Sequence, residues 1–144
     1  MDESEAWEQL KQARVGHLAT AGPDGLPHVV PFVFALEGRT IYWALDAKPK
    51  RGRELKRLAN IRANPNVDLV VDNYEEDWKN LWWVRAQGTA RILEPGTEET
   101  RARERLTEKY EQYEASPPPG PVVAIDVVKL VSWEGGRIVN RPSG

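Results

Sequence analysis

The chain has 144 residues, of which 20 are basic and 22 acidic, and a formal net charge of −2. This length predicts one domain, residues 1–144, with a hydrophobic core of its own. The absence of cysteine excludes disulfides, thiolate metal ligands and a cysteine nucleophile. No apolar run reaches the roughly 18 residues that a membrane helix needs. The acidic first residues precede no apolar signal segment, so we expect a cytoplasmic protein.

No residue pattern indicates a metal centre or a catalytic triad. The two histidines, His17 and His28, lack the spacing of a metal-binding pair. No serine lies in a Gly-x-Ser-x-Gly turn, and no glycine-rich phosphate loop is present. We therefore expect no metal, assign no catalytic residue and expect a bound cofactor to supply any chemistry.

The first third of the chain predicts a helix followed by a three-stranded meander. Apolar residues recur at helical spacing over 2–14. Strands are expected at 15–20, 27–36 and 40–45, joined by short turns rich in Gly, Pro and Asp. Pro31 cannot donate a hydrogen bond to a neighbouring strand, so its strand should lie at a sheet edge or carry a bulge.

A basic segment, 48–62, follows the third strand and contains seven Lys or Arg and one Glu. The periodicity predicts a helix that ends at Asn64 and Pro65. Its apolar face should carry Leu55, Leu58, Ala59 and the stem of Arg62, with Arg53, Arg57, Asn60 and Asn64 opposite. A solvated, arginine-rich helix is the plainer interpretation. Because strands precede and follow the segment, we favour an anion site at the start of the helix.

The rest of the chain predicts three further strands and one helix. Strands are expected at 66–74, 81–93 and 122–133, with Gly88 as a bulge or barrel corner. A helix is expected at 97–114, capped by the residues 97–100. The fold class is therefore mainly β (α+β): a six-stranded, mostly antiparallel barrel with flanking helices.

Several short motifs, in this order, resemble the split β-barrel flavin-binding family, which is the pyridoxamine-phosphate-oxidase-like group. The shared motifs are DGLPH at 24–28, VP at 30–31, ANPNV at 63–67 and QGTAR at 87–91. Others resemble its deazaflavin (F420)-dependent branch found in actinobacteria: KPK at 48–50, LANI at 58–61, DW at 77–78 and LWWVR at 81–85. The resemblance covers nearly the whole chain and implies the FMN-binding-protein-like split barrel.

The resemblance also implies a homodimer with a cofactor at the subunit interface, its phosphate held at the start of the basic helix. The matching bases are Lys48, Lys50, Arg51, Lys56 and Arg57. Lys50 and Arg57 rank first, and Asn60 is a further candidate. Seven bases would suit the oligoglutamate tail of F420 better than two would.

The remaining candidates belong to strands and loops. His28, Val30 and Pro31 match the family strand that passes beside the cofactor ring, although a histidine on a strand is more often structural. Adjacent residues of a strand point to opposite faces, so one of Trp82 and Trp83 should pack in the core and Trp83 is a candidate for the ring side. Trp78 lies on a loop and is either a cofactor or partner contact or plain loop structure.

The resulting hypothesis is an F420-dependent oxidoreductase that transfers a hydride from reduced F420 to a small unsaturated organic substrate. One alternative is an FMN-dependent oxidase similar to pyridoxamine-phosphate oxidase. Another is a non-catalytic protein that binds F420, a flavin or a haem-like ligand. The expected partners are a second copy of the chain and a small-molecule substrate. The slightly negative net charge argues against nucleic acid, and no membrane contact is expected.

Overall fold

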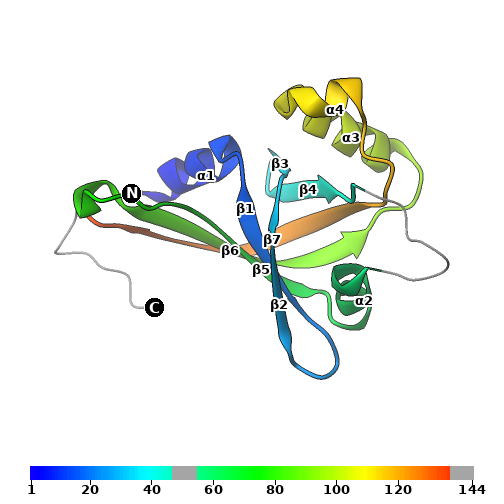
Figure 1. Cartoon of the computed structure of the whole chain (residues 1–144), viewed down its shortest axis with the longest axis horizontal. Coiled ribbons are helices and arrows are strands. Elements are labelled where there is room, and N and C mark those ends of the chain that lie inside the picture. The colour runs from blue at the N-terminus through cyan, green and yellow to red at the C-terminus, as the bar shows by residue number, and fades with distance from the viewer. Residues whose placement is uncertain (47–54, 137–144) are drawn as a thin grey trace.

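The computed structural model describes residues 1–46 and 55–136, and within them seven antiparallel strands form one sheet (Figure 1). Their spatial order is β2-β1-β5-β6-β7-β4-β3. The strands are β1 (Gly16–Ala21), β2 (Pro27–Phe32), β3 (Ala35–Glu37), β4 (Thr40–Ala44), β5 (Asn66–Asn73), β6 (Trp82–Ile92) and β7 (Val122–Glu134). The helices are α1 (Glu3–Gln12), α2 (Lys56–Ala63), α3 (Thr97–Lys109) and α4 (Glu111–Ala115), with a 3-10 turn, η1 (Trp78–Asn80).

Two strands that follow each other in the chain, β2 and β3, lie at opposite ends of the strand order. Only Val33 and Phe34 separate them, so the sheet must curl until its two ends meet, which produces the split barrel. The Phe34 N–H donates to the Tyr110 hydroxyl across 3.1 Å. That hydroxyl also lies 2.9 Å from the Phe34 carbonyl oxygen. At the crossing from β2 to β3, the backbone of Phe34 therefore pairs with a side chain and not with a neighbouring strand.

The predicted strand 27–36 is therefore wrong in one respect, since it is two strands, and six expected strands become seven. The expected three-stranded meander is also wrong. β1 pairs with β2, and β3 pairs with β4, but the two hairpins sit at opposite ends of the sheet. The edge position expected from Pro31 is confirmed, because β2 is a terminal strand.

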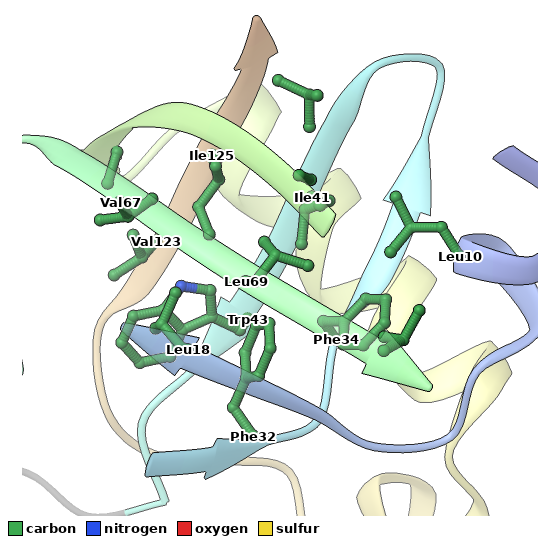
Figure 2. Close-up of a cluster of buried hydrophobic side chains, with 14 of the residues drawn as sticks. Leu10, Leu18, Phe32, Phe34, Ile41, Trp43, Val67, Leu69, Val123 and Ile125 are labelled. Atoms are coloured by element: carbon green, nitrogen blue, oxygen red, sulfur yellow. The ribbon is translucent and has the colours of Figure 1, made fainter. Parts of the chain in front are cut away.

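The barrel interior is filled by inward-facing side chains of alternating strand residues (Figure 2). Trp43 is 1% exposed and its ring meets the Phe32 ring edge-on, with centroids 6.3 Å apart. α1 closes one opening with Leu10, and α2 contributes Leu58 and Ile61. Other members of this core are Leu18, Phe34, Ile41, Val67, Leu69, Val123 and Ile125.

α3 and α4 pack on the outside of β4 and β7 through a second apolar cluster that includes Tyr42, Leu106 and Tyr113. The predicted helix 97–114 is divided at Tyr110, whose backbone is extended. The expected cap at residues 97–100 is also wrong, because Gly96 takes the N-cap position and no side chain caps α3.

The bulge predicted at Gly88 is confirmed by a register shift between Gln87 and Gly88. A Cβ at this position would lie 2.6 Å from Ile125 Cγ2 and 2.7 Å from the Asp126 carbonyl oxygen. Glycine is therefore required by the close approach of β7. No helix among the described residues is long and apolar enough to cross a membrane.

Candidate functional site

The start of α2 is an exposed, positively charged helix terminus. Leu55 occupies its N-cap position, and among the described residues no side chain caps the first backbone N–H groups. Lys56 is exposed and Arg57 half-buried on this first turn. Free N–H groups and the helix dipole favour an anion there. The bases Lys48, Lys50 and Arg51, which the sequence also indicated, lie outside the described residues.

Arg57 lies on the face of Trp43, with its guanidinium carbon 5.0 Å from the ring centroid. Two buried donors meet here without a hydrogen-bond partner in the described chain: Arg57 Nε and Trp43 Nε1. Burial lowers the pKa of Arg57, an effect that Asp46 and Tyr113 oppose. The Tyr113 hydroxyl donates to Asp46 Oδ1 across 3.3 Å. This half-buried cation with an unpaired donor fits the phosphate of a nucleotide-type cofactor.

Trp43, Asp46 and Tyr113 were not among the predicted site residues. Asp46 lies two residues after the end of β4. Its position as a carboxylate just before the basic segment could have indicated it. Trp43 and Tyr113 carry no such signal, because their sequence pattern is that of ordinary core aromatics.

Asn60 is 1% exposed and faces β1. Its Nδ2 donates to Thr20 Oγ1 across 3.1 Å. A Cβ added to Gly22 would lie 2.7 Å from Asn60 Oδ1, so the glycine that follows β1 leaves room for this amide. The predicted division of helix faces is confirmed for Leu58, which is buried, and is wrong for Asn60, which is also buried, and for Ala59 and Leu55, which are exposed.

The candidates on β2 divide between its two faces. His28 lies opposite Thr20, and Val30 lies opposite the core residue Leu18, so both share the inward face. Pro31 lies opposite His17 on the outward face. His28 Nδ1 is buried without a partner among the described residues. The structure thus brings His28 and Asn60 to the same residue, Thr20, and places Pro31 on the other side.

The two adjacent tryptophans of β6 point to opposite faces, as expected. Trp82 packs against the barrel core. Trp83 lies opposite Trp133 on the outward face, and the Arg85 guanidinium carbon is 5.8 Å from its ring centroid. Trp78, on η1, is 76% exposed. The turn between β5 and β6 that carries it lies at the opposite end of the molecule from α2 (Figure 1).

A curled antiparallel sheet with few helices defines the FMN-binding split-barrel class of folds. The chain belongs to the pyridoxamine 5'-phosphate oxidase family, whose model matches residues 3–134. This is a flavin-binding family, and the fold expected from the sequence is confirmed.

Solved structures with the same fold include an FAD-binding protein from Mesorhizobium loti, with a TM-score of 0.72 and 22% identity over 92% of this chain and 94% of that chain. A conserved hypothetical protein from Mycobacterium tuberculosis has a TM-score of 0.76 and 23% identity, and the match covers 100% of this chain and 93% of that chain. HutZ, the heme storage protein from Vibrio cholerae, has a TM-score of 0.70 and 17% identity, and the match covers 92% of this chain and 96% of that chain. No curated protein matches the chain.

Proposed function

We propose that the protein binds F420 and transfers a hydride between this cofactor and a small unsaturated organic molecule. The observation that carries the proposal is the start of α2. Among the described residues, no side chain caps this helix terminus, and the buried Nε of Arg57, next to Lys56, has no hydrogen-bond partner. When bound, the reduced deazaflavin supplies the hydride, and the protein binds and orients it.

In this proposal Arg57 is the central phosphate ligand. Its guanidinium is held on the Trp43 ring, and the nearby Asp46 carboxylate favours its charged form. Arginine can bind a phosphate through two parallel N–H groups, whereas Lys56 acts as a point charge. Lys48, Lys50 and Arg51 precede them in sequence, and we assign to these bases the cofactor's oligoglutamate tail.

We further propose a homodimer. The β5–β6 turn, which carries Trp78, lies at the opposite end of the molecule from α2 (Figure 1). Both can therefore border one cofactor only when they come from different subunits. The outward face of β5, β6 and β7 carries the half-buried residues Val70, Trp83, Val131 and Trp133. Arg85 lies between Val70 and Val131 on the same face, and aromatic residues and arginine are enriched at subunit interfaces.

The experiment is a fluorescence titration of the purified chain with F420, FMN and FAD, followed by turnover with reduced F420 and a panel of enones and enimines. We expect micromolar or tighter F420 binding that weakens at least tenfold in Arg57→Met. The control Arg39→Met removes an exposed arginine of the β3–β4 turn and should bind as the wild type does.

Tight FMN binding without F420 binding would overturn the proposal in favour of the flavin oxidase. Tight F420 binding without turnover of any substrate would overturn the hydride-transfer part and favour a storage or carrier protein. Light scattering tests the dimer. Val131→Lys should yield a monomer with weakened F420 binding, and a wild-type monomer would contradict the assembly.

A further inference from the structure

A groove is lined by residues of α1, the segment that follows it, β3 and α3. Figure 1 shows where these elements lie in the fold. Its volume is about 520 Å³, and its apolar lining residues are the buried Ala35 and the half-buried Leu36. A second hollow of about 550 Å³ shares Leu36 and four charged residues with it, so the groove continues toward the first turn of α1. None of these residues belongs to the site at α2.

Two cations meet at one end of this groove. Lys109 Nζ is buried and has no hydrogen-bond partner in the described part of the chain. It lies 4.3 Å from the centroid of the Phe34 ring and 5.3 Å from that of Tyr110. The Arg14 guanidinium carbon lies 4.7 Å from the same Tyr110 ring. Aromatic faces attract cations only weakly. Among the residues that the structure describes, neither cation is paired with a carboxylate.

The acids that line the groove are engaged elsewhere. Glu108 pairs with Arg105 across 2.8 Å, and Glu8 accepts a hydrogen bond from Gln12 Nε2 across 2.7 Å. Within the described ranges no ion pair to Lys109 or Arg14 is found. Burial, together with the like charge of Arg14, lowers the pKa of Lys109 to about 8. At neutral pH this lysine is still mostly charged, and a buried charge without a partner is costly.

We propose that this groove binds a small organic carboxylate. The carboxylate would lie between Lys109 and Arg14, and the apolar body of the ligand against Ala35 and Leu36. The volume suits a ligand of that size, because small-molecule sites span roughly 300–1,000 Å³. An anion there offsets the charge of the buried ammonium and weakens the repulsion between the two cations. The site is independent of the cofactor site proposed at α2.

The test is a titration of the full chain with benzoate, and separately with inorganic phosphate, followed by NMR of ¹³C-labelled lysine and backbone amides. We expect saturable benzoate binding, shifts at Leu36 and Lys109, and a rise in the pKa of Lys109 when benzoate is bound. Lys109→Met keeps the stem and removes the charge, and it should weaken benzoate at least tenfold. Arg14→Gln changes an exposed residue and should weaken it several-fold. Lys79→Met, an exposed control on η1, should bind as the wild type does.

Absence of saturable benzoate binding would overturn the proposal, as would unchanged affinity in Lys109→Met and Arg14→Gln. If phosphate bound as tightly as benzoate, the claim that Ala35 and Leu36 contribute to ligand binding would be overturned. F420 titration of the same variants separates the two sites. Lys109→Met should bind F420 as the wild type does. Failure of the wild type to bind benzoate would overturn only this inference, and failure of the wild type to bind F420 would overturn only the proposed function.

Discussion

The side-chain amide of Asn60 donates a hydrogen bond to the Thr20 hydroxyl across 3.1 Å, and this bond joins the basic helix α2 to β1. Both residues are almost completely buried, with 1% and 3% of their surfaces exposed. The position of Arg57, three residues earlier on the helix, therefore depends on a polar contact beneath it.

Asn60→Ala is expected to destabilise the protein by about 1–3 kcal/mol, because it leaves the buried Thr20 hydroxyl without its partner. It should also weaken F420 binding, since α2 loses its anchor on β1. Urea denaturation and F420 titration measure the two effects. The control Asn80→Ala changes an exposed asparagine of η1 and should alter neither. An Asn60→Ala protein of wild-type stability would contradict the role of this bond.

Gly88→Ala is expected to destabilise the protein by about 1–3 kcal/mol, because the added methyl group meets Ile125 and the backbone of Asp126 at under 3 Å. The backbone of a central strand cannot move aside without breaking its pairing. The control is Gly96→Ala, where the nearest atom to the new Cβ is 4.0 Å away. Thermal unfolding of the two variants provides the comparison, and equal melting temperatures would contradict the prediction.

Tyr110→Phe removes the hydroxyl that pairs with the Phe34 backbone at the crossing between β2 and β3. A buried N–H without a partner costs about 1–3 kcal/mol. We expect a loss of that size in urea denaturation and faster hydrogen exchange of the Phe34 amide. Tyr74→Phe, at a side chain that is 69% exposed, should change neither quantity. Unchanged exchange at Phe34 would show that the crossing does not rely on this hydroxyl.

The pKa of Lys109 predicts how stability depends on pH. Its value is about 8 in the folded protein and 10.5 ordinarily. Between these values the unfolded chain binds more protons, so stability rises with pH across this window. Below pH 8 both states are protonated and the cost is fully present. The charged groups around it are Glu8, Lys11, Arg14, Arg105 and Glu108, with Tyr110 beneath.

Lys109→Met should therefore be more stable than the wild type at pH 7, by about 1–2 kcal/mol after allowance for solvent screening. The difference should shrink as the pH approaches 10. Comparison with the variant is needed because burial raises the pKa of Tyr113 to about 12, which makes stability fall above pH 10 in both proteins. Urea denaturation at pH 7, 8, 9 and 10 measures the difference, and parallel curves would contradict the assignment.

Local signals predicted much of the fold. Pro31 indicated an edge strand and Gly88 a bulge, because each follows from the backbone chemistry of one residue. The break at Val33 and Phe34 could not be predicted, since its cause is the hydroxyl of Tyr110, 76 residues away. The helix predicted at 97–114 is divided at Tyr110, the same residue whose hydroxyl contacts Phe34.

The charged residues of the candidate site were predicted from the sequence, but the way they pack against the rest of the chain was not. Lys56 and Arg57 stand out as bases at a helix start. Asn60 was predicted on the outward face because helical periodicity puts it opposite Leu55, Leu58 and Ala59, and a polar face is expected to point to solvent. Only the hydroxyl of Thr20 and the space left by Gly22 make an inward asparagine possible, and neither residue is near it in sequence.

The link of Val33 and Phe34 also affects how the barrel closes during folding. In strand order the two edges of the sheet are as far apart as they can be, but along the chain they are separated by two residues. Loop-closure entropy depends on separation along the chain. The hairpins of β1 with β2 and of β3 with β4 can each form locally and are joined at once, so closure of the barrel does not require a long-range search.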